Sequence, residues 1–204
     1  MTHAALVVSH LAGALLLGAG ISGSLLAAER ARRVRTLEQL DGALRVGALF
    51  EQRVLAPGVV LLLVSGAWLV VAYYGGWRFV DVPWLAGMVL LFAIECARGA
   101  TMKRAHLTRL ARLVEDARAR GRFVPELDRV RNDAAAAFGR FLEATVCALL
   151  LALGVFRPQS WTMFWGGGIL AVFAAAVLTS YVGRPPASLA SLLSSASVDG
   201  DGRS

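Results

Sequence analysis

Four charged residues stand in apolar stretches of the sequence, at spacings that put each pair on one face of a helix. Glu95 and Arg98 are three residues apart, and Arg140 and Glu143 repeat this spacing with the charges reversed. A charge at the centre of a membrane span costs about 2.5 to 3.5 kcal/mol on insertion scales, so such residues are candidate functional sites. Both glutamates lie about 21 Å, by helical rise, from the outer ends of their spans. If the two helices are neighbours, we expect cross-pairs of Arg140 with Glu95 and of Arg98 with Glu143.

Two interpretations of this polar cluster stay open. In the first, the pairs neutralise one another and fix the register of the helices. In the second, they form a polar pocket on the cytoplasmic side that binds a charged ligand or passes a proton. Glu51 and Arg53, at the foot of the second span, are expected to join that pocket.

His10 is the only histidine within an apolar span, and it lies about 28 Å from the cytoplasmic end of that span. A neutral imidazole is a ligand for haem or a metal, but one histidine supplies a single ligand, so the residues alone favour an interfacial hydrogen bond. The chain has no paired-cysteine motif, phosphate-binding loop or nucleophile elbow. We therefore predict no metal site and assign no catalytic residue.

The elements that position these residues are apolar runs long enough to cross a bilayer. The 204 residues are 57% hydrophobic and only 17% charged, a balance outside the usual range for a soluble domain. A helix crosses a ~30 Å hydrocarbon layer in about 20 residues. The predicted spans are 4–28, 54–77, 80–101, 136–156 and 161–182. The sequence therefore predicts an all-α, polytopic membrane protein in which four spans form a helical bundle and a fifth packs against it.

Local signals refine two of these spans. Pro57-Gly58 is expected to loosen or kink the first turns of the second span, because proline removes a backbone donor. Small residues four apart, Ala14 with Gly18 and Ala19 with Gly23, are expected to let another helix approach the first span closely.

The distribution of Lys and Arg predicts the orientation. Of these 21 residues, 19 lie in 29–53, in 98–140 and after 182, which puts the amino terminus outside and the carboxyl terminus in the cytoplasm. Aromatic residues gather at the predicted outer ends, as in an interfacial belt: Tyr73, Tyr74, Trp77, Trp84, Trp161 and Trp165. Because basic residues beside spans are the ordinary orientation signal, the net charge of +7 does not predict nucleic-acid binding.

The connection 102–135 carries an apolar stripe at helical spacing, with arginines on the other face. We expect it to continue the third helix into the cytoplasm as far as Gly121, and a further helix to begin at Pro125. It is either a hairpin that contacts lipid or a partner, or a solvated extension that orients the spans. Residues 1–184 then form one domain, and 185–204 are expected to be a disordered cytoplasmic tail.

Three short motifs carry a resemblance to a known family. They are Ser9-His10-Leu-Ala-Gly13, then Ser65-Gly66-Ala-Trp68 leading to Gly75-Gly76-Trp77, and Arg140-Phe-Leu-Glu143 leading to Phe156-Arg157-Pro158. Their order over about residues 9–158 resembles a bacterial family of predicted integral membrane proteins, domain of unknown function 2269. More distantly, it is similar to the copper-resistance protein D domain and to haem-containing membrane protoporphyrinogen oxidases.

The oxidase resemblance implies that His10 ligates haem and that Glu143 matches the acidic residue of the last shared span. Those oxidases place a lysine soon after the second span and a histidine late in the third. This chain has no lysine in 78–88 and has Glu95 in the third span. Its fifth span is an addition to their four-helix core. The uncharacterised family is therefore the better match.

The sequence thus predicts a protein of the bacterial cytoplasmic (inner) membrane, whose polar cluster is structural or binds a ligand. One alternative is a haem-binding oxidoreductase resembling protoporphyrinogen oxidase, with His10 as the haem ligand. A further alternative is a small transporter or accessory subunit. Apolar spans require the lipid bilayer as a partner, and a homo-oligomer or a partner in a membrane complex stays open.

Overall fold

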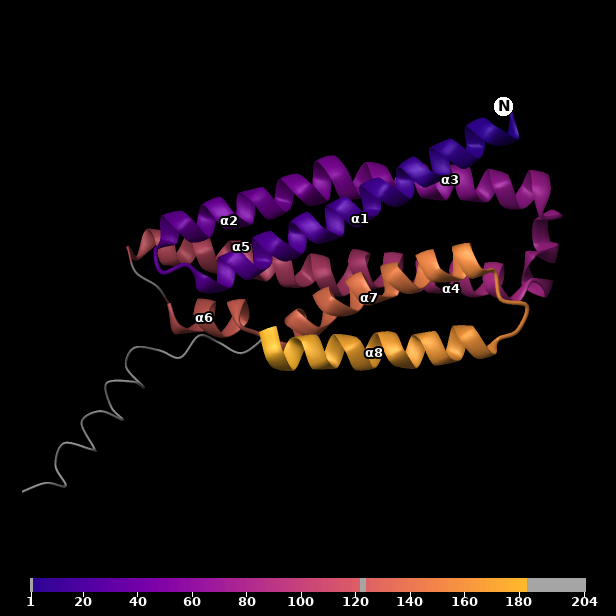
Figure 1. Ribbon diagram of the computed structural model, residues 1–204. Coiled ribbons are helices and arrows are strands. Elements are labelled where there is room, and N and C mark those ends of the chain that lie inside the picture. Colours follow the sequence, from indigo (N-terminus) through magenta and orange to yellow (C-terminus); the bar gives the residue numbers. More distant parts are fainter. Residues whose placement is uncertain (1, 122–123, 183–204) are drawn as a thin grey trace, which may run out of the picture.

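The computed structural model describes residues 2–121 and 124–182, which fold into helices joined by short links (Figure 1). In chain order these are α1 (His3–Arg33), α2 (Leu37–Phe50), η1 (Glu51–Leu55), α3 (Ala56–Tyr73), η2 (Gly76–Asp81), α4 (Pro83–Arg98), η3 (Gly99–Lys103), α5 (Arg104–Ala119), α6 (Pro125–Arg131), α7 (Ala134–Phe156) and α8 (Thr162–Val182). Two of them, η1 and η3, are π-helical turns, and η2 is a 3-10 helix. These two ranges contain no strand, so the expected all-α fold is confirmed. The predicted tail, 185–204, lies outside the described residues.

Five helical stretches in this part of the chain are long and apolar enough to cross a bilayer. They are His3–Arg33, Leu37–Tyr73, Pro83–Ala119, Pro125–Phe156 and Thr162–Val182. Many of their large apolar side chains point outward: Leu15, Val71 and Ile169 are each more than 70% exposed, at 76, 71 and 72%. Such a surface is unfavourable in water and is expected where lipid tails surround a helix.

The helices differ from the predicted spans 54–77 and 80–101 at all four ends. The second helical stretch begins at Leu37, because α2 continues into α3 through η1. That stretch ends at Tyr73, because Gly75 takes a φ of 72° and turns the chain into η2. The third stretch starts at Pro83, where a first-turn proline loses no helical hydrogen bond, and it runs through η3 into α5.

The loosening expected at Pro57-Gly58 takes the form of a π-turn, and the helix is not interrupted. In η1 the backbone N–H of Ala56 bonds to the carbonyl of Glu51, five residues back. A proline cannot donate to the carbonyl four residues before it and clashes with that carbonyl. Widening the preceding turn therefore lets the helix continue through Pro57.

Glycines set the contact between α1 and the second helical stretch. A Cβ added at Gly20 would lie 2.7 Å from the Cα of Leu55, and one added at Gly58 would lie 2.8 Å from the backbone nitrogen of Leu17. Such distances show that the backbones meet directly, as small residues allow in membrane proteins.

The predicted contact face of α1 was partly wrong. Gly23 does pack closely, against the ring of Phe50, but nothing lies within 4 Å of a Cβ placed on Gly18. The contacting glycines are instead Gly13, Gly20 and Gly23, with spacings of seven and three residues that follow one helical face.

The fifth span packs on α7, away from α3 (Figure 1). Leu149 and Leu153 of α7 meet Phe164 and Ala171 of α8 in one apolar cluster, against which residues of α4 also pack. The hydroxyl of Thr145 donates a hydrogen bond of 3.0 Å to the carbonyl of Ala171 across the same interface.

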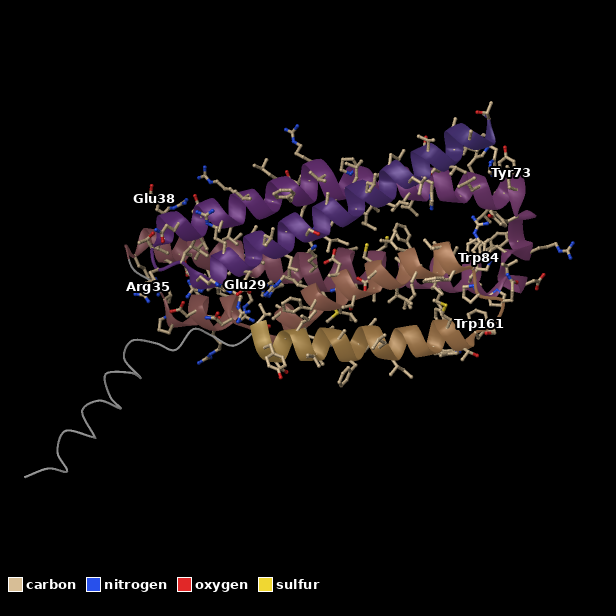
Figure 2. The ribbon with its side chains drawn as sticks, viewed as in Figure 1. Glu29, Arg35, Glu38, Tyr73, Trp84 and Trp161 are labelled. Atoms are coloured by element: carbon tan, nitrogen blue, oxygen red, sulfur yellow. The ribbon has the colours of Figure 1, made fainter. Side chains whose placement is uncertain are left out.

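The bundle has two chemically different ends. Figure 2 shows Glu29, Arg35 and Glu38 at one end and Tyr73, Trp84 and Trp161 at the other. We call the first the basic end, and it carries α2, α5, α6 and the last turn of α1. We call the second the aromatic end. At the aromatic end the guanidinium of Arg157 lies over the ring of Trp84, at 5.5 Å from its centroid.

The basic end has an apolar core of its own. The stripe predicted along 102–135 is buried there: Leu110, Val114 and Ala117 of α5 pack against Leu40 of α2 and Leu127 of α6. This segment is therefore folded onto the bundle and is not a free extension.

Candidate functional site

Five charged side chains from three helical stretches form one chain of ion pairs, which we call the polar cluster. Arg98 of α4 lies 2.6 Å from Glu95 and 3.7 Å from Glu143 of α7. Lys103 of η3 lies 3.1 Å from Glu143 and 2.8 Å from Glu51 of η1. The charges alternate in the order Glu95, Arg98, Glu143, Lys103, Glu51, so Glu143 is shared by both cations.

The two π-turns carry the last two members of the polar cluster, Lys103 and Glu51. Glu51 is the first residue of η1 and Lys103 is the last residue of η3. A π-turn carries an extra residue within a helix, redirects the side chains around it and is frequent at functional sites. Gly139 of α7 gives the cluster room, because a Cβ there would lie 3.1 Å from Nη1 of Arg98.

The polar cluster is partly shielded from solvent and carries an excess of negative charge. Its side chains are only 15 to 25% exposed, and three carboxylates face two cations. Burying a charge is costly unless it is paired, and each cation here contacts two carboxylates. Removing either cation would leave its two carboxylates without their shared counter-ion in a partly buried site, which is unfavourable.

The structure brings together some of the residues that the sequence singled out. Arg98 and Glu143 form the cross-pair that equal depth predicts, and Glu51 joins them through Lys103. Arg53 does not join, because its side chain is exposed on the outer face of η1.

The expected pair of Arg140 with Glu95 does not form. Arg140 instead interacts electrostatically with Arg32 and Glu29 of α1 and with Asp133 at the start of α7. Within the described ranges, it has no ion pair at 4 Å or less. The rotation of α7 explains the difference, because it turns Glu143 towards α4 and Arg140 towards α1.

Lys103 is the cluster member that sequence reasoning missed. It stands two residues beyond the predicted third span and was counted with the basic connection. The available signal was the helical stripe after it, which implied that the helix continues and that Lys103 still belongs to it.

A cavity of about 950 Å³ lies between α1, α2, α5 and α7, and the polar cluster forms part of its wall. Small and apolar side chains form much of the rest, among them Ala27, Ala28, Ala31, Ala43, Leu44 and Ala48. The basic residues in the wall are Arg45, Arg98, Lys103, Arg118, Arg131 and Arg140, and the acidic ones are Asp41, Glu51, Glu115, Asp133 and Glu143. This volume falls in the range of pockets that hold small molecules.

His10 lies elsewhere, in the contact between α1 and α3. Its Nδ1 is 3.0 Å from the hydroxyl oxygen of the buried Ser65. Because that hydroxyl donates to the carbonyl of Leu61, its oxygen accepts from Nδ1–H, and Nε2 remains as the unprotonated nitrogen. A Cβ on Gly66 would lie 3.1 Å from the His10 ring, so this glycine makes room for it. Among the residues described, no group of three or more His, Cys, Asp and Glu side chains could hold a metal ion.

Five spanning-length helices with apolar outer faces and a charged interior define the class of polytopic integral membrane proteins. Comparison with known families agrees. The chain belongs to the family described as "Predicted integral membrane protein (DUF2269)", whose family model matches residues 4–158. No curated protein and no solved structure matches the chain. The matched region runs from α1 to the end of α7, so it includes the whole polar cluster and leaves out α8.

Proposed function

We propose that this protein binds a small ligand in the cavity at its basic end, from the cytoplasmic side of a bacterial inner membrane. The observation that carries the proposal is that four of the five charges of the polar cluster stand in the wall of a cavity of about 950 Å³: Arg98, Glu143, Lys103 and Glu51. Ion pairs serving only to fix helix register would be expected in a filled interface. Here they border open space that a ligand can enter.

The distribution of charge supports the orientation. The basic end carries 29–53 and 98–140, which hold most of the 21 Lys and Arg residues of the chain. Under the positive-inside rule this end faces the cytoplasm. The tryptophans of the aromatic end then lie at the outer interface of the bilayer, where such rings are enriched.

Mass spectrometry of the protein purified from native membranes tests the proposal. We expect a small molecule to be retained by the wild type and lost from Ala136→Phe, because Ala136 lines the cavity on α7 and a phenyl ring there fills it. Ala148→Phe is the matched control, since Ala148 is exposed on the outer face of the same helix. Equal retention in both variants, or no bound molecule in the wild type, would contradict the proposal.

We also propose haem binding at His10 as a second candidate function, because of its hydrogen bond to Ser65. Metal-bound histidines commonly donate their other N–H to a neighbouring acceptor, which fixes the ring and raises its basicity. Haem would supply redox chemistry at this site: His10 would bind the iron through Nε2, and Ser65 would orient the imidazole through its contact with Nδ1. Wild-type protein with haem added should show a Soret band that His10→Ala loses and His3→Ala keeps. A colourless wild type would exclude this candidate.

A further inference from the structure

One cation in the cavity wall differs from the other five. Arg45 and Arg118 both contact Asp41, at 2.9 and 3.0 Å, and Arg131 contacts Asp128 at 2.7 Å. Arg98 and Lys103 belong to the polar cluster. In contrast, Arg140 has no carboxylate within 4 Å among the residues that the structure describes.

The carboxylates nearest to Arg140 are already engaged. Glu29 contacts Arg32 at 3.4 Å and Arg33 at 3.2 Å. Asp133 accepts the backbone N–H of Ala135 at 3.0 Å and so caps the start of α7. The side chain of Arg140 is only partly exposed, and a partly buried charge without a counter-ion is unfavourable unless something else supplies one.

The wall around Arg140 also limits what the rest of a ligand can be. His106 of α5 also lines the cavity and is close enough to Arg140 for their charges to interact. Its imidazole is therefore a second polar group that a ligand at Arg140 can contact. The opposite wall, from α1 and α2, consists mainly of alanines, whose side chains offer no hydrogen bonds, and its charged members Asp41 and Arg45 are paired with each other. This wall suits an apolar body.

We propose that Arg140 binds the oxyanion head of an organic anion, a carboxylate or a phosphate, whose apolar body lies against the α1 and α2 wall. The inference rests on the proposed ligand site and names the chemistry of its ligand. A guanidinium binds either head through two parallel hydrogen bonds, which a single ammonium cannot reproduce.

Binding of matched probes to the protein in lipid nanodiscs tests this inference. Octanoate and octyl phosphate share an apolar chain and differ in the anionic head, whereas octylamine carries the same chain with a positive charge. We expect at least one of the two anions to bind the wild type, and octylamine to bind more weakly. Whichever anion binds more tightly identifies the head.

Variants then test the assigned residue. Arg140→Gln should weaken binding of the anion by about tenfold or more, the usual effect of losing a charge-assisted pair. Arg140→Lys should keep part of the affinity, which also covers the case in which the glutamine variant fails to fold. Arg120→Gln is the matched control, because Arg120 lies outside the cavity wall, is paired with Asp116 and is 57% exposed. Its affinity should stay within about twofold of the wild type.

Two outcomes would overturn the inference: octylamine binding as tightly as the anions, or an anion affinity that Arg140→Gln leaves unchanged. The absence of binding by both anions would do the same. The proposed function is tested separately. It fails if the wild type retains no molecule, or if Ala136→Phe retains it as well as Ala148→Phe does. A retained molecule that is neutral or cationic would therefore uphold the site and reject this assignment of its ligand.

Discussion

The contact of α1 with α3 and the contact of α1 with α5 and α7 show two ways of holding helices together. In the first, glycines let the backbones touch, and a Cβ at Gly58 would lie 2.8 Å from the nitrogen of Leu17. In the second, charged side chains line a cavity of about 950 Å³ between the helices. The backbones touch around Gly20 and Gly58, whereas the second contact leaves an open space. The molecule therefore has a rigid half, where α1 packs closely on the second helical stretch, and a half with a large cavity.

The largest expected effect lies in the rigid half. Gly20→Val should lower the free energy of unfolding by about 3 kcal/mol, because its Cβ would meet the backbone of Leu55, which cannot move aside as a side chain can. Chemical unfolding in mild detergent measures the change. Gly18→Val, two residues away with nothing within 4 Å, is the control and should be nearly neutral. Equal losses in the two variants would show that the helices do not meet through this face.

A smaller effect is expected in the polar cluster. Lys103→Met keeps an unbranched side chain, one atom shorter, but leaves Glu51 and Glu143 without their shared cation, which should cost about 2 kcal/mol in a site that is 15 to 25% exposed. Adding Glu51→Gln should restore part of the loss, because it removes one of the two facing carboxylates.

Thermal unfolding of the two single variants and the double variant measures this coupling. Arg53→Gln is the control and should change stability little, because Arg53 is exposed outside the cluster. Strictly additive losses for Lys103→Met and Glu51→Gln would argue that the two side chains do not interact.

The smallest expected effect concerns a polar contact in the rigid half, the one between His10 and Ser65. Ser65→Ala deletes the partner of His10 Nδ1 and should cost about 1 kcal/mol. Ser9→Ala is the matched control, because the Ser9 hydroxyl is exposed and bonds only within its own helix, to the carbonyl of Ala5. A loss in Ser9→Ala as large as in Ser65→Ala would show that the His10 contact contributes nothing specific.

The sequence predicted what depends on hydrophobicity and depth along a helix. Largely apolar runs located the five spans, and counting residues placed Glu95 and Glu143 at one level, which predicted the cross-pair of Arg98 with Glu143, 3.7 Å apart. It could not predict how far each helix is rotated about its axis. That rotation decides whether Gly18 or Gly20 meets the second helical stretch, and whether Arg140 faces Glu95 or α1.

The π-turns are the second feature that the sequence did not predict. Each shifts the phase between the helical faces on its two sides, so a regular period of 3.6 residues drawn through η1 or η3 assigns the following residues to the wrong face. Lys103 was missed for a different reason: it stands two residues beyond the predicted third span, where a cation is the ordinary orientation signal.

The extra residue in η3 also divides the continuous helix from Pro83 to Ala119 into two parts with different surroundings. Its first part turns one face to the membrane, and its second turns Leu110, Val114 and Ala117 into a core of the kind found in water-soluble proteins. Deleting one residue of η3 would rotate α5 by about 100° relative to α4 and expose that core, without disturbing the segment in the lipid. The π-turn thus sets the angle between the face that α4 turns to the lipid and the face that α5 turns to its own core.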